Sequence, residues 1–251
     1  MISKGLISLV RSLEHKKHRL REGLFVAEGP KVVGDLLQRF TPACIIATAE
    51  ACDVARGIGD DCRFIEVTAD ELRRLSFLQH PQQVMALFRL PPAAPAASHS
   101  DLTLALDGVQ DPGNVGTIIR TADWFGIDTI VCSPDTADAY APKVVQATMG
   151  SLARVSVVYT DLPSYLRRSR AAGDATRVYG TFLQGDDIFR CDLSGGGIIV
   201  VGNEGKGISA DVEQTVTHRL TIPGHGAAHG DSLNVAIATA IVCAAFRRGD
   251  V

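Results

Sequence analysis

The most constraining feature of the sequence is a regular alternation of short apolar runs with helix-like segments between residues 103 and 247. The runs are nearly continuous in Val and Ile, which is typical of strands buried on both faces of a parallel sheet. Such strands need helical connections between them. We therefore predict an α/β fold with a mainly parallel sheet and helices on both faces. The predicted strands are 103–107, 128–133, 155–159, 177–182, 198–202 and 219–223, and the predicted helices are 114–125, 141–150, 162–172, 209–216 and 232–247.

A smaller α/β domain is predicted for residues 1–90. Residues 91–100, PPAAPAASHS, are rich in Pro and small residues without periodicity, which indicates a linker. The remaining domain then spans 101–251. In the first domain the predicted helices are 3–13, 30–40 and 69–75, and the predicted strands are 24–28, 44–48, 63–67 and 84–90.

The net charge of −3 does not by itself indicate nucleic-acid binding, but the charge is unevenly distributed. Residues 1–90 hold 13 Lys and Arg against 11 Asp and Glu, whereas residues 91–251 hold 12 against 17. A basic segment, RSLEHKKHRLRE, occupies residues 11–22. It can be an ordinary solvated face or an electrostatic contact for a phosphate backbone. Its cationic residues are Arg11, Lys16, Lys17, Arg19 and Arg21, beside His15 and His18.

The six cysteines show neither C-x-x-C nor another paired-ligand spacing, so we expect no structural metal site. Several lie in apolar runs, as buried free thiols do in a reducing compartment.

Lys4 and Arg11 interrupt the N-terminal apolar residues, which argues against a signal peptide. The longest apolar run, 235–246, is too short to span a bilayer. We expect a cytoplasmic protein that does not enter a membrane.

Ligands of open α/β sheets bind beyond the carboxyl ends of the strands, which directs attention to loops 108–114, 202–208 and 223–232. The second loop follows a strand and reads GNEGKG, which fits neither the G-x-G-x-x-G dinucleotide fingerprint nor a Walker A loop. It can be a tight turn that requires glycine. It can also be a loop whose backbone approaches a ligand, with Glu204 as a charged contact.

The first and third loops carry polar residues at predicted helix starts. Asn114 can cap the helix that follows it, and Ser232 or Asp231 can cap the last helix. Asn234 stands inside an apolar helix start, where a polar side chain is less expected. Arg120 lies among apolar helical residues and needs an anionic partner or an opening to solvent. Asp123 and Glu204 are candidate partners for Arg120, whereas His225 and His229 are expected to be exposed loop residues rather than a metal site or general base.

Three segments that occur in order, each after a predicted strand, carry a family resemblance: NVGTIIRTADWFG, GNEGKGI and IPGHG…SLNVAIATAI. They resemble the signature motifs of the SpoU (TrmH-type) family of RNA ribose 2′-O-methyltransferases, within the SPOUT superfamily. Residues 143–157 resemble the region between the motifs of that family. Residues 3–37 resemble the N-terminal RNA substrate-binding domain of many members.

The resemblance implies a catalytic domain with a deep trefoil knot, S-adenosylmethionine as cofactor, no required metal, and a homodimer with the active site near the subunit interface. By matching position, the cofactor contacts would be Gly202, Ile222 and Leu233. The polar active-site set would be Asn114, Arg120, Glu204, Ser232 and Asn234.

In that family the residue matching Arg120 activates the ribose 2′-OH. Two roles stay open for Arg120: general base, or a cation that binds the adjacent phosphate and orients the hydroxyl. Asn114 and Ser232 would position Arg120 and the ribose, and Glu204 could orient Arg120.

The sequence departs from the family pattern in its third motif, which is longer by about two residues over 224–231. Asp231 stands where members often have Glu. This departure puts cofactor contacts from this loop in doubt.

Two alternatives remain beside a methyltransferase. A catalytically silent RNA-binding protein on the same scaffold is disfavoured because all five polar site residues are present. A nucleotide-dependent oxidoreductase is disfavoured by the missing dinucleotide fingerprint. The N-terminal domain with its basic segment favours structured RNA as the substrate, and ribosomal RNA over transfer RNA by analogy with relatives that carry this domain.

Overall fold

A computed structural model of the chain describes residues 2–55, 62–92, 102–171, 176–193, 196–224 and 232–248. Most of the predicted linker therefore lies outside the described residues. The chain divides into two compact units, one formed by Met1–Pro92 with Asp138–Arg154, the other by Ala93–Ala137 with Val155–Val251. The sequence-based boundaries differ in one respect, because they assign 138–154 to the C-terminal domain.

The first unit contains a four-stranded sheet of order β1-β4-β2-β3, in which only β2 and β3 run parallel. Val10 of α1, Val26 of β1 and Leu75 of α4 belong to the core on one face of this sheet. The α/β prediction for this region is confirmed, although α2 was not expected as a separate helix. The elements are α1 Lys4–Ser12, α2 Lys16–Glu22, β1 Leu24–Glu28, α3 Pro30–Leu36, β2 Pro42–Ala47, the 3₁₀ helix η1 Ala49–Ala55, β3 Arg63–Glu66, α4 Ala69–Leu75 and β4 Val84–Arg89.

Residues 138–154 supply the remaining elements of this unit, α6 Pro142–Ala147 and the 3₁₀ helix η2 Ser151–Ala153. Tyr140 lies 5.0 Å from Phe25 between ring centroids and belongs to a cluster with Phe40 and Phe88. This aromatic packing buries Tyr140 and raises its pKa to about 12. The cluster gives the segment an apolar anchor on the sheet.

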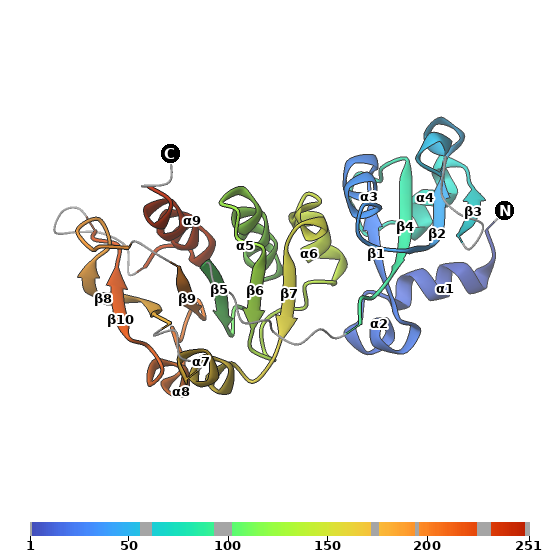
Figure 1. Cartoon of the computed structure of the whole chain (residues 1–251). Helices are drawn as coiled ribbons and strands as arrows, with labels where there is room; N and C mark the ends of the chain where they lie inside the picture. Colours follow the sequence, from blue (N-terminus) through green and yellow to red (C-terminus); the bar gives the residue numbers. More distant parts are fainter. Residues whose placement is uncertain are drawn as a thin grey trace. The chain divides into compact units, whose positions relative to one another are not determined.

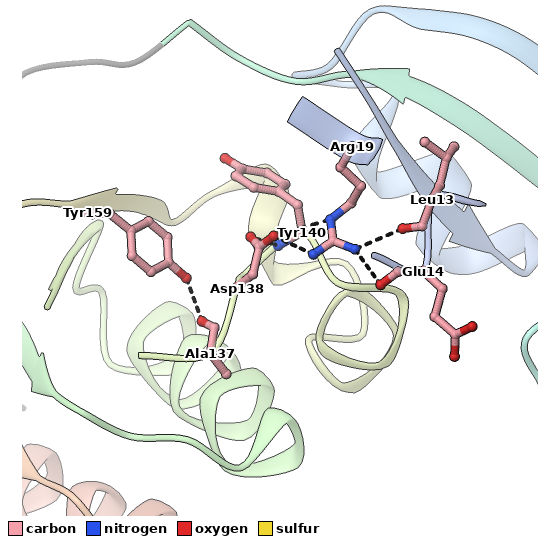
Figure 2. A network of polar contacts seen from close by, with 7 residues as sticks. All are labelled: Leu13, Glu14, Arg19, Ala137, Asp138, Tyr140 and Tyr159. Carbon is pink, nitrogen blue, oxygen red and sulfur yellow. Dashed lines mark hydrogen bonds and ion pairs between the residues drawn. The ribbon is translucent and has the colours of Figure 1, made fainter. Parts of the chain in front are cut away.

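Arg19 supplies the polar anchor (Figure 2). Its Nε donates to Oδ2 of Asp138 at 3.1 Å, and a second guanidinium nitrogen reaches the same oxygen. Its Nη1 donates to the carbonyls of Leu13 and Glu14, both at 2.8 Å. Arg19 is 2% exposed. Neither interpretation of the basic segment, a solvated face or a phosphate contact, applies to Arg19, because its charge is neutralised inside this unit.

Replacing Arg19 by methionine is expected to lower the free energy of unfolding by about 3 kcal/mol, since it leaves the Asp138 carboxylate without its buried counterion. Arg21→Met on the same helix is the control. The Arg21 side chain is 65% exposed and pairs with Glu22, so its loss should cost less than about 1 kcal/mol. Urea denaturation followed by circular dichroism measures both. Equal losses in the two variants would contradict the role assigned to Arg19.

The second unit contains a six-stranded sheet of order β10-β8-β9-β5-β6-β7, in which every neighbouring pair is parallel. The predicted parallel α/β sheet is confirmed. β8 is longer than expected, and α5 and α9 begin and end at other residues than predicted. The elements are β5 Leu102–Asp107, α5 Pro112–Trp124, β6 Thr129–Cys132, β7 Ser156–Tyr159, α7 Leu162–Ala171, β8 Val178–Asp187, β9 Gly197–Gly202, α8 Ala210–Glu213, β10 His218–Thr221 and α9 Val235–Phe246.

Helices cover both faces of this sheet, α5 and α9 on one side and α7 and α8 on the other (Figure 1). Ala105 of β5 and Val200 of β9 pack with Leu166 of α7 and Val212 of α8 in one core cluster. Because strand side chains alternate, the neighbouring residues of β5 point to the α5 and α9 side. The most apolar helix, α9, has 12 residues, and no helix in the described ranges has both the length and the apolar character to cross a bilayer.

Candidate active site

The candidate site lies where β5 and β9 end. In the register of these two strands Asp107 pairs with Gly202, so the loop after β5 starts beside the loop after β9. The chain continues from β5 toward β6 and β7, whereas β9, β8 and β10 lie on the other side of β5. The two loops thus meet at a topological switch point, the place where open α/β sheets bind ligands.

The first loop ends at α5, which begins earlier than predicted. Asp111 is the N-cap residue, and its side chain accepts a hydrogen bond of 2.8 Å from the backbone N–H of Asn114. Pro112 occupies the first helical turn, where its missing N–H costs nothing. The structure thus excludes the interpretation of Asn114 as the helix cap. Because Asp111 caps α5, the Asn114 side chain is available for contacts outside the helix.

The second loop is a tight turn whose ends, Asn203 and Gly207, exchange two backbone hydrogen bonds of 2.9 Å. The Glu204 carboxylate extends from this turn toward the first loop. It accepts a 3.0 Å hydrogen bond from Nδ2 of Asn114 and longer ones of 3.4 Å from the backbone N–H groups of Gln110 and Asp111. Glu204 therefore bridges the two loops.

The third motif contributes Asn234, which is the N-cap of α9. Its Oδ1 accepts hydrogen bonds from the N–H groups of Ala236 at 2.9 Å and Ile237 at 3.3 Å. Its Nδ2 donates to Oδ1 of Asn114 at 2.9 Å. The capping role considered for Ser232 or Asp231 is excluded. Asn234 stands at the start of the helix and not inside it as expected, because α9 begins only at Val235.

Asn234, Asn114 and Glu204 thus form one directed chain of hydrogen bonds in which each amide donates toward the carboxylate. Partial burial raises the pKa of Glu204, but the hydrogen bonds from Asn114 and from the backbone of Gln110 and Asp111 outweigh this effect. The net pKa lies below the usual 4.5. The Glu204 side chain is consequently an anionic acceptor at neutral pH, and it fixes the orientation of the Asn114 amide.

Arg120 and Ser232 are not joined to this chain. Arg120 lies in the third turn of α5 with an exposed side chain, and within the described ranges it makes no hydrogen bond or ion pair. The Glu204 carboxylate contacts Asn114 instead of the Arg120 guanidinium suggested by the sequence. Ser232 is exposed just before α9. Both side chains are accessible to a ligand.

The residues matched to cofactor contacts surround the same loops. Gly202 is the last residue of β9, and a Cβ there would lie 2.3 Å from backbone atoms of Gly207 and Ile208. Ile222 directly follows β10 and is half-buried, and Leu233 is 51% exposed. Residues 225–231, including His225, His229 and most of the lengthened loop, lie outside the described residues. In the described part of the chain no three metal-ligating side chains gather.

Comparison with protein families decides the assignment, since the model of the SpoU rRNA Methylase family matches residues 101–244. The chain belongs to this family. Residues 5–86 match the MRM3-like substrate binding domain. These two matches cover most of both predicted domains.

Relatives of this SpoU-family chain span nearly its whole length. A 23S rRNA (guanosine(2553)-2′-O)-methyltransferase, RlmP of Bacillus subtilis, is 33% identical over 92% of each chain. A solved TrmH-family protein from Porphyromonas gingivalis has 44% identity and a TM-score of 0.90 over 99% of each chain. An AdoMet-bound rRNA methyltransferase from Sinorhizobium meliloti has 31% identity and a TM-score of 0.88, covering 100% of this chain and 97% of the other.

Two further polar residues, which the sequence did not single out, shape this site. Asp111 could have been identified from its place directly before Pro112, because Asp followed by Pro is a common helix start. Asp107, 7% exposed, accepts a 2.6 Å hydrogen bond from the N–H of Ser209 and so ties the end of β5 to the segment after the second loop. No local pattern marks Asp107, because its partner is distant in sequence.

Proposed function

We propose that this SpoU-family protein transfers the methyl group of S-adenosylmethionine to a ribose 2′-OH in structured RNA, with ribosomal RNA favoured. The observation that carries the proposal is the hydrogen-bonded chain Asn234–Asn114–Glu204 at the switch point, with the Arg120 guanidinium exposed on the same helix as Asn114. The names of the related rRNA 2′-O-methyltransferase from Bacillus subtilis and of the AdoMet-bound rRNA methyltransferase from Sinorhizobium meliloti support the same substrate and cofactor.

The residues around the loops fit the cofactor. An adenosine needs apolar walls and backbone polar groups. Leu233 and Ile222 offer apolar surface that the chain itself leaves partly uncovered. The turn 203–207 offers backbone carbonyl groups, since most of its N–H groups donate within the turn. Gly202, Ile222 and Leu233 would hold the cofactor, which when bound supplies an electrophilic methyl group. The deep trefoil knot of the family is part of this proposal.

Arg120 has the chemistry to prepare the nucleophile. A guanidinium stays protonated in proteins, so we assign Arg120 the binding of the neighbouring RNA phosphate and stabilisation of the charge that develops on the 2′-oxygen. Asn114, oriented by Glu204, and the exposed Ser232 would position the ribose. Transfer gains most from such positioning, because a hydroxyl is a weak nucleophile.

Glu204→Gln is expected to lower kcat about tenfold, because Asn114 is then held less firmly in its orientation. This corresponds to an increase of roughly 1.4 kcal/mol in the activation free energy. Because the folded-state pKa is depressed, the carboxylate contribution is complete above the unfolded value of about 4.5 and disappears only as pH falls through the lower folded value. The pH–rate profiles of the variant and the native protein should therefore be parallel between about pH 6 and 9. Profiles that converge at the acidic end would show that Glu204 titrates within this range.

The RNA is expected to contact residues 1–90. Lys16 and Lys17 are exposed on α2, and Arg21 beside them is also exposed. Arg19 is excluded from this surface by its buried ion pair, and Arg11 donates to the carbonyl of Arg74. The contribution of the basic segment to RNA binding is thus smaller than its sequence indicates.

The free cysteines are consistent with the reducing cytoplasm, where we propose that the protein acts.

We also propose a homodimer that uses the surface of α5 and α9, which pack against one another. Trp124 is 84% exposed at the end of α5, and Ile237 is 55% exposed on α9. Large apolar side chains this exposed are typical of interfaces.

Trp124→Glu is expected to convert the dimer to a monomer, as measured by light scattering coupled to size-exclusion chromatography. The control is Leu20→Glu, at an exposed position of α2, which should leave the dimer intact. A dimeric Trp124 variant would refute this interface.

Incubation with S-adenosylmethionine labelled in the methyl group and purified rRNA or tRNA tests the function. The expected result is label in rRNA that resists alkaline cleavage at one nucleotide, as a 2′-O-methylated ribose does. Label in no RNA despite cofactor binding would refute the proposal. RNA binding without cofactor binding would favour the catalytically silent alternative.

A further inference from the structure

The chain has only three asparagines, and all three lie at the candidate site. Asn114 and Asn234 belong to the hydrogen-bonded chain described above. The third, Asn203, stands between Gly202 and Glu204, and its side chain connects the first two loops. Its Nδ2 donates to the backbone carbonyl of Gly108 at 2.7 Å.

The other end of the same amide holds the second loop in its turn. Oδ1 of Asn203 accepts hydrogen bonds from the N–H groups of Gly205 at 2.9 Å and Lys206 at 3.0 Å. A carbonyl oxygen can only accept and backbone N–H groups only donate, so just one orientation of the amide satisfies all three contacts. Aspartate could replace only the accepting half of this arrangement.

These contacts make the place of Glu204 depend on Asn203. The direct links from Glu204 to the backbone of the first loop are long, 3.4 Å each, whereas the Asn203 link is 2.7 Å. Without the bond to Gly108, the turn that carries Glu204 would keep its shape but lose its closest side-chain attachment to the first loop. Glu204 would then no longer hold Asn114 in a fixed orientation.

We propose that Asn203 is a positioning residue for methyl transfer. It holds the second loop in a fixed position against the first, and it thereby orients Glu204 and Asn114 toward the ribose. This inference rests on the proposed function. Misplacement of reacting groups by a fraction of an ångström to an ångström lowers rates by about 10- to 100-fold. The effect should appear in kcat rather than in the KM for RNA, because Asn203 is not assigned a contact with the RNA.

The test compares Asn203→Ala, which removes both halves of the amide contacts, with Asn203→Asp, which keeps the acceptor and removes the donor. Gln214→Ala, at an exposed amide after α8, is the matched control and should keep the native kcat. Both Asn203 variants are expected to lose about 10- to 100-fold in kcat at saturating RNA and cofactor. In a double-mutant cycle their effects should be strongly non-additive with Glu204→Gln.

An Asn203→Asp variant with the native kcat would overturn the proposal, because the turn alone would then suffice. Additive effects with Glu204→Gln would overturn it as well. Hydrogen exchange separates this test from the proposed function, since it needs no activity. Faster exchange at the N–H groups of Gln110 and Asp111 in both variants supports the link between the loops even if the native protein methylates no RNA. Unchanged exchange contradicts it.

Discussion

Replacement of Arg120 by alanine is expected to lower kcat for methyl transfer by about 1,000-fold while S-adenosylmethionine binding stays at the native affinity. The side chain is exposed and makes no hydrogen bond or ion pair in the described part of the chain, so its removal breaks nothing in the fold. What is lost is the donor pair that we propose binds the RNA phosphate and stabilises the charge developing on the 2′-oxygen. Arg120→Lys keeps the charge but not the forked geometry of the guanidinium donors. Its kcat should therefore lie between the values of the native protein and of Arg120→Ala.

Single-turnover methylation measures the rate, and calorimetry measures cofactor affinity. Arg167→Ala is the matched control, because Arg167 is an exposed arginine on α7 that also makes no described ion pair. It should keep the native rate. An Arg120→Ala variant within threefold of the native kcat would show that Arg120 takes no part in the reaction.

The second large effect is expected at Gly202. A Cβ on Gly202 would lie 2.3 Å from the backbone of Gly207 and Ile208, so alanine cannot be accommodated unless the turn 203–207 opens. Opening moves Glu204 and the backbone proposed to hold the cofactor. We expect Gly202→Ala to weaken S-adenosylmethionine binding by about 100-fold, which corresponds to about 2.7 kcal/mol.

Gly205→Ala provides the control within the same turn. A Cβ on Gly205 would meet only Oδ1 of Asn203, at 3.7 Å, which is ordinary van der Waals contact. Its cofactor affinity should therefore stay within about threefold of native, since alanine at this position causes no clash. Calorimetric titration of S-adenosylmethionine into both variants measures the difference. Equal affinities for the two variants would contradict the steric argument.

The sequence was sufficient to predict the sheet, because buried parallel strands have continuous Val and Ile runs that local patterns show directly. Helix starts were harder to locate. The caps of α5 and α9 could not be identified from the sequence, because Asp111 and Asn234 compete with Asn114 and Ser232, which are equally good capping residues. Only backbone geometry distinguishes them. The attachment of residues 138–154 to the first unit could not be predicted either, since Arg19 and Asp138 are 119 residues apart.

Local chemistry and motif order within the sequence were enough to predict the three loops of the candidate site and the polar side chains that they carry: Asn114, Arg120, Glu204, Ser232 and Asn234. The tertiary structure alone decided how these side chains are connected. The register of β5 against β9 brings Glu204 to Asn114 rather than to Arg120, and it brings Asn203 to Gly108. Hydrogen bonds form between atoms about 3 Å apart, and residues some 90 positions apart in sequence reach that distance only after the sheet has formed.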